Sequence, residues 1–169
     1  NTTLFYYNGD VRASAASSGK EMIRSQQYRL GTINSDAITG LVKQTFSYFA
    51  GKEGEEKVNY SQTYTGAAGS ETVRNTTISW YGTTPVRATD TSVTGDTTLN
   101  KTTQYRLGTA GSDTLTGLTL QNVTFFDATN KLAGEEKQNY SQTYNSAGTA
   151  VLNTTLFYYN GDVRASAAS

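Results

Sequence analysis

The sequence predicts an all-β protein of tandem antiparallel hairpin and meander repeats, forming an elongated sheet, a β-solenoid or a filament. Three observations predict this class. The first seventeen residues, Asn1–Ser17, return letter for letter as Asn153–Ser169, which gives a period of 152 residues. Tyr28–Thr32 returns as Tyr105–Thr109, which adds an inner period of 77 residues. Short runs rich in Thr, Val, Tyr and Phe alternate with glycine-containing clusters, a pattern typical of strands joined by turns.

Self-similarity at a fixed period is typical of repeat proteins rather than of single globular domains. We expect residues 1–26 to end a preceding repeat, residues 27–103 to form repeat A and residues 104–169 to form repeat B. The equivalent of residues 18–26 in a following unit would complete repeat B. The sequence therefore predicts no separate globular domain.

The expected strands follow one another closely enough for each to pair with its sequence neighbour. They are Thr2–Tyr7, Met22–Leu30, Leu41–Phe49, Lys57–Tyr64, Glu71–Tyr81, Val86–Val93, Thr97–Leu107, Leu118–Phe126, Lys137–Tyr144, Ala150–Tyr159 and Val163–Ala167. Residues 13–18 are rich in Ala and Ser without an apolar stripe, which favours a loop or a strand end over a helix.

The strongest turn signal is Asn8-Gly9-Asp10, repeated as Asn160-Gly161-Asp162. An Asn-Gly pair supplies the positive φ angles of a type I′ hairpin, and we expect that turn here.

Composition limits the kind of core and the kind of partner. Apolar residues make up 36% of the chain and mean hydropathy is −0.53, so burial must come from strand surfaces of Thr and of the twelve Tyr, six Phe and one Trp. Lys plus Arg and Asp plus Glu both number 14, which leaves no electrostatic footprint for nucleic acid. Zero net charge also tolerates the close packing of many copies. No apolar stretch is long enough for a membrane span.

The residue types present argue against catalysis, and we expect neither an enzyme nor a cofactor. The chain has no His and no Cys, which removes the common nucleophilic triads and histidine or thiolate metal sites. A glycosidase-like carboxylate pair would have to come from the densest acids, Glu53, Glu55, Glu56, Glu135 and Glu136. Because these acids are copied in both repeats, we interpret them as solvated turns. No calcium-loop motif is present, so no metal site is expected.

Strand chemistry points to assembly. Thr2–Tyr7 and Asn75–Tyr81 combine high β propensity with little charge and no Pro, the marks of segments that pair between chains. The turn and assembly candidates are Asn8, Gly9, Asp10, Trp80, Tyr81, Asn160, Gly161 and Asp162. Candidate glycosylation sites are the sequons at Asn1, Asn59, Asn75, Asn100, Asn122, Asn139 and Asn153.

Tyr60–Tyr64, a Gly-rich turn, Asn75–Tyr81 and Val86–Ala88 together resemble the YD-repeat class of the Rhs and teneurin proteins. The resemblance implies an extracellular repeat protein whose tyrosine-rich strands form a long antiparallel strip that winds into a shell or spiral. The Tyr-Asp dipeptide and Gly-Arg turn of that class are missing, and the similarity lies in repeat style rather than in a specific motif.

The function expected from these patterns is that of a structural extracellular or cell-surface repeat protein, which self-assembles into a β-rich filament, fibre or sheath. Its partners would be copies of itself, with glycans as further ligands, and neither nucleic acid nor a membrane span is expected. Three alternatives remain open: the stalk of a carbohydrate-binding adhesin, part of an Rhs-like encapsulating shell, and a designed repeat protein.

Overall fold

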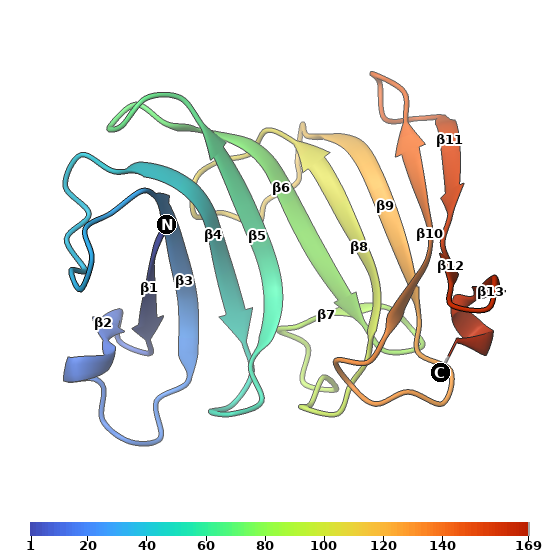
Figure 1. Ribbon diagram of the computed structural model, residues 1–169, viewed down its shortest axis with the longest axis horizontal. Helices are drawn as coiled ribbons and strands as arrows, with labels where there is room; N and C mark the ends of the chain where they lie inside the picture. The colour runs from blue at the N-terminus through green and yellow to red at the C-terminus, as the bar shows by residue number, and fades with distance from the viewer. Residues whose placement is uncertain (169) are drawn as a thin grey trace.

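The computed structural model describes residues 1–168 as one open, 11-stranded antiparallel sheet with a separate two-stranded hairpin (Figure 1). The described residues contain no α-helix, and the all-β prediction is confirmed. Figure 1 shows the long strands side by side in a single layer, with the first strand near one end and the last near the other.

The strands agree with most of the predicted ranges. They are β1 (Thr2–Tyr7), β2 (Val11–Arg12), β3 (Met22–Arg29), β4 (Val42–Ala50), β5 (Lys57–Thr65), β6 (Thr72–Tyr81), β7 (Val86–Arg87), β8 (Leu99–Arg106), β9 (Thr119–Asp127), β10 (Lys137–Tyr144), β11 (Val151–Leu156), β12 (Tyr158–Tyr159) and β13 (Val163–Arg164). Two 3₁₀ turns, η1 (Ala13–Ala15) and η2 (Ala165–Ala167), follow β2 and β13.

The sheet is a meander in the order β11-β10-β9-β8-β6-β5-β4-β3-β1-β2, with β7 paired to the end of β6. The short strands β2, β7 and β13 each return from the preceding strand as a small hairpin. The long antiparallel meander is therefore present, and within residues 1–168 it does not close on itself.

Three predicted strands are wrong in extent. Val86–Val93 is a strand only at Val86 and Arg87, because the chain then turns, with Asp90 N–H donating to the Arg87 carbonyl and Asp90 Oδ1 accepting from Ser92 N–H. Val163–Ala167 ends in a 3₁₀ turn in the same way. The predicted strand Ala150–Tyr159 divides at Phe157 into β11 and β12.

The Asn8-Gly9-Asp10 turn joins β1 to β2 as expected, but it is not a type I′ turn. The positive φ angles fall at Gly9 (92°) and Asp10 (60°), one position later than the Asn-Gly pattern predicts. Asp10 tolerates this conformation because a short polar side chain can bond locally. Its carboxylate also lies 2.7 Å from the Arg24 guanidinium on β3.

The two repeats use their long strands in the same order. Strands β1, β6 and β11 are equivalent, as are the pairs β3 and β8, β4 and β9, and β5 and β10. Every pairing between long strands contains a register shift, and these shifts recur at equivalent positions, as at Gln27/Tyr28 and Gln104/Tyr105. Such bulges increase the local right-handed twist, which explains the coiled appearance of the sheet in Figure 1.

Loops folded back across one face of the sheet provide much of its cover. We call residues 30–41 and 107–118 the first and second fold-back loops. Ile38 and Leu41 of the first loop pack against the buried cluster of Leu4, Tyr28 and Phe46. The largest fully buried side chains of the described residues are Ile78, Gln62 and Thr76, in the middle of the sheet where the second loop lies. This centre of burial is polar as well as apolar.

Candidate functional site: the junction between repeats

The candidate site is the place where the last strand of one repeat meets the first strand and the fold-back loop of the next. We call it the inner junction. Its members are Asn59, Tyr60 and Gln62 on β5, residues 76–87 on β6 and β7, and residues 107–113 of the second fold-back loop. It holds the most buried polar side chains of the described residues, and none of them was singled out as a binding residue from sequence.

The Gln62 side chain on β5 binds the main chain of the second fold-back loop. This side chain is 0% exposed, and Nε2 donates to the main-chain carbonyls of Thr109 (2.9 Å) and Ser112 (3.0 Å). The Gly111 N–H donates back to Oε1 at 2.9 Å. A carboxamide presents donors and an acceptor at one tip, so it satisfies three main-chain groups that would otherwise be buried without partners.

Thr76 on β6 determines how closely the loop approaches the sheet. Its hydroxyl donates to the Leu107 carbonyl at 2.9 Å. The next residue, Gly108, has φ +149°, and a Cβ there would collide with Thr76 Oγ1. Glycine is therefore required both for the backbone angle and for the contact. Leu107 itself has φ +67°, so the chain reverses sharply as it leaves β8.

The same arrangement occurs at the start of the chain. Thr2 Oγ1 donates to the Leu30 carbonyl at 3.1 Å, and a Cβ on Gly31 would collide with that hydroxyl. Leu30 has φ +68°, within one degree of Leu107. The two fold-back loops therefore leave the sheet with one shared backbone geometry.

Arg87 connects three separate segments of the junction. Its Nε donates to Asn59 Oδ1 on β5 (3.0 Å), and Nη2 donates to Asp113 Oδ2 in the second loop (2.8 Å). The guanidinium also lies 5.9 Å from the centroid of the Trp80 ring. Because the planar fork can address two partners in fixed directions, Arg87 links repeat A to the loop of repeat B.

Tyrosine hydroxyls complete the junction. Tyr60 donates to the Gly111 carbonyl (2.8 Å) and Tyr81 donates to the Val58 carbonyl (2.9 Å). The Tyr60 ring stacks on Tyr48, with centroids 4.3 Å apart. Burial raises the pKa of the Tyr60 phenol and of the Tyr81 phenol, which keeps both hydroxyls protonated as donors.

Parts of the junction recur at both ends of the sheet. Near β1, Arg12 lies 3.4 Å from Asp36, the counterparts of Arg87 and Asp113. Near β11, Arg164 donates to Asn139 Oδ1 at 2.6 Å, which reproduces the contact of Arg87 with Asn59. Tyr159 likewise donates to the Gln138 carbonyl at 2.7 Å, as Tyr81 does to Val58. Each end therefore contains a different part of the inner junction.

The strand register is also shared. Gln62 pairs with Thr76 in β5–β6, and Gln142 pairs with Thr154 in β10–β11, one strand position from Ser61↔Thr77 and Ser141↔Thr155 respectively. The β10–β11 pairing therefore has the same register as the β5–β6 pairing at the inner junction.

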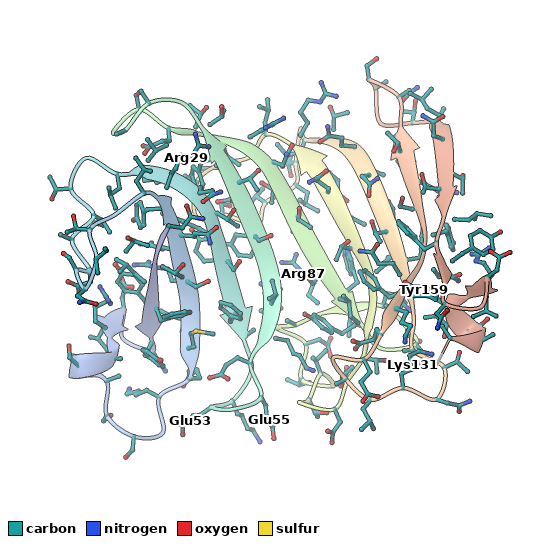
Figure 2. The ribbon with its side chains drawn as sticks, viewed as in Figure 1. Arg29, Glu53, Glu55, Arg87, Lys131 and Tyr159 are labelled. Atoms are coloured by element: carbon teal, nitrogen blue, oxygen red, sulfur yellow. The ribbon has the colours of Figure 1, made fainter. Side chains whose placement is uncertain are left out.

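The repeated acidic turns have a more specific role than solvation. Glu56 Oε1 accepts the Met22 N–H (2.9 Å), and its counterpart Glu136 accepts the Leu99 N–H (2.7 Å). These carboxylates therefore cap main-chain donors at the starts of β3 and β8. Figure 2 shows the labelled Glu53 and Glu55 at the turn between β4 and β5, at the edge of the molecule.

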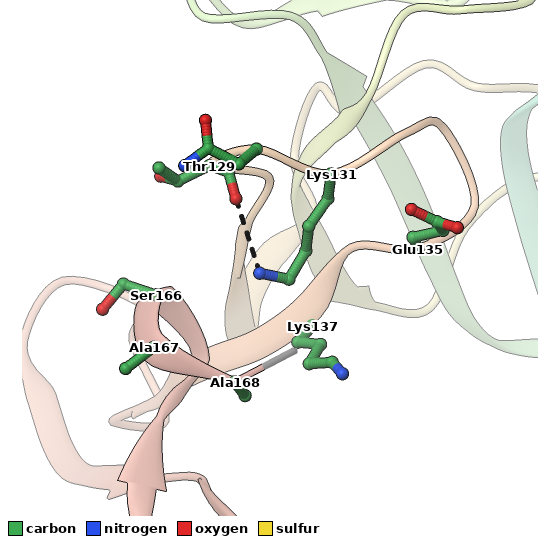
Figure 3. Close-up of a pocket in the computed structure, with 8 residues that line it drawn as sticks. Thr129, Lys131, Glu135, Lys137, Ser166, Ala167 and Ala168 are labelled. Atoms are coloured by element: carbon green, nitrogen blue, oxygen red, sulfur yellow. Dashed lines mark hydrogen bonds between the residues drawn. The ribbon is translucent and has the colours of Figure 1, made fainter.

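A cleft of about 580 Å³ lies between the β9–β10 loop and η2 (Figure 3). Lys131 crosses it and donates to the Thr129 carbonyl (3.5 Å) and to the Ala165 carbonyl (3.2 Å). A cleft of about 480 Å³ occupies the equivalent place between Gly51–Glu55 and Ala88–Thr94. Because the cleft recurs with the repeat, it is a groove of the architecture rather than a unique site.

The predicted assembly residues are not brought together. Trp80 donates from Nε1 to Thr103 Oγ1 (2.9 Å), and Tyr81 is only 6% exposed, so both are used inside the sheet. Asn8 donates to Oε1 of Glu21 (2.8 Å), the residue that directly precedes β3. The remaining candidates, Gly9, Asp10, Asn160, Gly161 and Asp162, form the β1–β2 and β12–β13 turns near opposite ends of the sheet.

The prediction that Asn75–Tyr81 pairs between chains is wrong within this structure. The segment forms most of β6, which is paired on one side with β5 and on the other with β8. Its high β propensity therefore stabilises a strand in the centre of the sheet. Thr2–Tyr7, in contrast, forms β1 near the edge, where β2 covers only Tyr6 and Tyr7.

The sequons differ in access. Asn59 is 7% exposed and accepts a hydrogen bond from Arg87, so the folded protein does not present it to solvent. Asn139 is half-buried and is bonded by Arg164. Asn1 and Asn153 are exposed, and Asn75, Asn100 and Asn122 are half-buried.

No family model, curated protein or solved structure matches this chain. Residues 1–168 contain no group of three or more acidic side chains arranged to hold a metal ion. No helix in that range is both long enough and apolar enough to cross a membrane. What the fold and the junction define is a class: a repeat protein of antiparallel β-sheet.

Sequence reasoning missed Gln62 and Arg87, and it singled out Asn59 and Trp80 for other roles. A signal was present, because Gln62 returns as Gln142 and Arg87 has counterparts in Arg12 and Arg164. Polar residues that recur at a fixed period on Tyr-rich strands mark contacts between repeats. Without knowledge of the fold-back loops, the same residues resemble ordinary solvent-facing strand positions.

Proposed function

We propose that this chain is a segment of a structural tandem-repeat protein, located outside the cell or on its surface, that forms an elongated β-rich filament, fibre or sheath. The observation that carries the proposal is the repeated junction. The same residues meet in the same register at β5–β6 and at β10–β11. A contact that recurs with the repeat allows units to be added in line without a new interface.

The nature of the junction supports a mechanical role. Backbone ladders run continuously across it, and Gln62, Arg87 and Tyr60 add side-chain bonds to a loop from the next repeat. Stacked rings recur at Tyr48–Tyr60 and Phe125–Tyr140, with centroids 4.3 and 4.4 Å apart. Such cross-strand aromatic pairs resist slippage of the register.

The proposal is tested with covalent tandem chains that contain one, two and three 152-residue units. Small-angle X-ray scattering should give a maximum dimension that rises by a constant increment with each unit. Replacing Gln142 and Arg164 by Ala at the junctions between units should broaden the distribution of interatomic distances obtained from the scattering. These substitutions weaken the contact between units and leave the rest of each unit unchanged. Chains that collapse to a compact particle, with no constant increment, would reject the structural function.

The extracellular location is tested separately on cells that express the native protein. Antibody labelling and protease treatment of intact cells should detect and cleave it. Labelling that requires permeabilised cells would reject this part of the proposal.

A carbohydrate-binding stalk is a second candidate, favoured by exposed aromatic side chains. Phe5 is 47% exposed and Tyr158 is 55% exposed, so part of each ring is accessible for contact with a sugar. A glycan array should then show micromolar binding that Phe5→Ala and Tyr158→Ala abolish. An array without binding would reject this alternative.

A further inference from the structure

The two ends of the sheet carry complementary parts of the inner junction. Near β1, the first fold-back loop already has the backbone of the second, since Asn34 (φ 59°) replaces Gly111 (φ 74°) and Ser35 N–H bonds to Thr32 as Ser112 does to Thr109. Near β11, Gln142 stands at the position of Gln62 but is only half-buried. One end has the loop, and the other has the glutamine.

The arginine contacts divide in the same way. Arg87 contacts both Asn59 and Asp113 at the inner junction. Arg12 contacts Asp36 near β1, and Arg164 contacts Asn139 near β11. Placed together, Asn139, Arg12 and Asp36 would reproduce the complete set.

The position occupied by Leu4, Ile78 and Leu156 in the three equivalent strands shows how this division affects burial. Ile78 of β6 is 0% exposed and Leu4 of β1 is 2% exposed, whereas Leu156 of β11 is 45% exposed. Ile78 has β8 beside its strand, Leu4 has β3 beside its strand, and each has a fold-back loop on the same face. Strand β11 pairs only with β10 among the described residues. If β1 took the place of β11, it would bring β3 and the first fold-back loop with it, and this position would be buried.

One edge of β1 is largely unpaired. On this edge β2 pairs only with Tyr6 and Tyr7, so Thr2–Phe5 pair with no strand there among the described residues. The corresponding edge of β6 is divided between two partner strands: β7 pairs with Trp80 and Tyr81, and β5 pairs with Thr72–Ile78.

We propose that two copies of this chain join head to tail by strand exchange, with β1 of one copy replacing β11 on β10 of the other. This rests on the proposed structural function and names the partner of its junction. Thr3 then pairs with Ser141 of the other copy, as Thr77 pairs with Ser61 inside the chain. The first fold-back loop closes over Gln142, with the Thr32 and Ser35 carbonyls and the Asn34 N–H as its partners.

Identical sequence makes the exchange nearly balanced. Because Asn1–Ser17 and Asn153–Ser169 are the same peptide, β1 restores on β10 the pairs that Asn153–Leu156 give up, and only the Tyr144↔Val151 pair is lost. The joined form is stabilised by the hydrogen bonds of the fold-back loop to Gln142 and by the contacts of Arg12 with both Asn139 and Asp36. It is opposed by the entropy lost when two copies associate. The extent of joining therefore rises with protein concentration, as for domain-swapped proteins.

Disulfide trapping tests the proposal, since the natural chain has no cysteine. The T3C/S141C variant is refolded from urea at several concentrations and oxidised. It should give a ladder of dimers, trimers and longer species on non-reducing gels, which increases with concentration and collapses on reduction. Within one copy the two positions lie on β1 and β10, separated by the whole sheet, so they can meet only between copies.

Three matched variants give the controls. S61C/T77C should form a bridge inside the chain, which establishes that this strand position accepts a disulfide. S141C/T155C should lock β11 on β10 and keep the chain monomeric by light scattering. T2C/S141C is one residue out of register, which points the two side chains to opposite faces, and it should form at least tenfold less oligomer than T3C/S141C.

The proposal is overturned if S61C/T77C closes while T3C/S141C stays monomeric at the highest concentration, or if T2C/S141C cross-links equally well. These outcomes are distinct from failure of the structural function. Covalent tandem chains that lengthen by a constant increment, with no cross-linked oligomer, would retain the filament and reject strand exchange.

Discussion

The Arg87 guanidinium lies 2.8 Å from the Asp113 carboxylate, and this pair joins a short hairpin on β6 to the loop that follows β8. About a fifth of the Arg87 side chain is exposed (21%), and its Nε donates a second hydrogen bond to Asn59 Oδ1. The pair therefore differs from an ordinary surface ion pair, because its geometry is held from two sides.

Replacing Arg87 by Lys should lower the free energy of unfolding by about 1–2 kcal/mol, since an ammonium cannot address Asn59 and Asp113 together. Arg12→Lys is the matched control. It should cost less than about 0.5 kcal/mol, because Arg12 is more exposed and its pair with Asp36 is longer. Urea unfolding followed by circular dichroism measures both, and equal losses would contradict the special role of the inner junction.

Gln62→Ala should be among the most destabilising substitutions on the sheet, at about 3 kcal/mol, because it leaves the Thr109, Gly111 and Ser112 main-chain groups without their partner. Gln142→Ala removes the same residue type from the half-buried counterpart and should change stability by about 0.5 kcal/mol or less. Thermal or urea unfolding separates them. Similar values for both would show that Gln62 does not hold the loop.

Gly108→Ala should cost more than about 2 kcal/mol, because the new Cβ both meets Thr76 Oγ1 and strains the backbone at φ +149°. Gly117→Ala tests strain alone. It also has a positive φ (+77°), but no atom lies within 4 Å of the position that its Cβ would take, so about 1 kcal/mol is expected. The difference between the two losses in unfolding free energy measures the close approach of the loop.

Stability should fall as the pH rises above 10. Burial raises the pKa of Tyr60, Tyr64 and Tyr81 in the folded protein above the usual value of 10.0. Between that value and the folded pKa, the unfolded chain releases protons that the folded chain retains, so unfolding becomes progressively easier. Ionisation of these buried phenols should therefore coincide with the loss of circular dichroism, and Tyr60→Phe should reduce the slope of stability against pH above pH 10. Buried phenols that ionise in a fully folded protein would contradict this prediction.

Acid should weaken the fold through Glu71. Its side chain is 1% exposed, and the Lys43 N–H that donates to Oε1 at 2.9 Å is the main cause of the lowered pKa of this carboxyl. Because the folded pKa lies below the unfolded one, the stabilisation is present above about pH 4.5 and is lost as the pH falls through the folded pKa. Glu71→Gln should flatten this acid limb of the stability curve. An unchanged limb would assign acid sensitivity to other groups.

Much of the architecture was predictable because it depends on short-range patterns. The strand ranges of β3 to β6 and β8 to β10 follow from β propensity and glycine turns, and neighbouring strands pair because their connections are short. The errors fall where local chemistry competes with propensity. At Asp90 the side chain bonds to Ser92 and ends the strand that Val86–Val93 predicts.

The junction was not predictable in the same way. Gln62 and Gly111 are forty-nine positions apart, and nothing in the spacing of either residue indicates that a loop folds back over the face of the sheet. The prediction that Asn75–Tyr81 is an assembly strand failed for a related reason. Whether a strand lies at the edge or in the centre of the sheet depends on the strands before and after it in the chain, and not on its own sequence.

By itself, the sequence determined an all-β chain of repeated strands, its turns and its period, because these follow from propensity and from recurrence along the chain. Tertiary structure alone decided which strand lies at an edge and which polar side chains are buried. It also decided that the copied residues 1–16 occupy a different environment from residues 153–168. The physical reason is that burial depends on neighbours: Leu4 and Leu156 lie in copies of the same peptide, yet they are 2% and 45% exposed because only Leu4 has both a β3-type strand and a fold-back loop beside it.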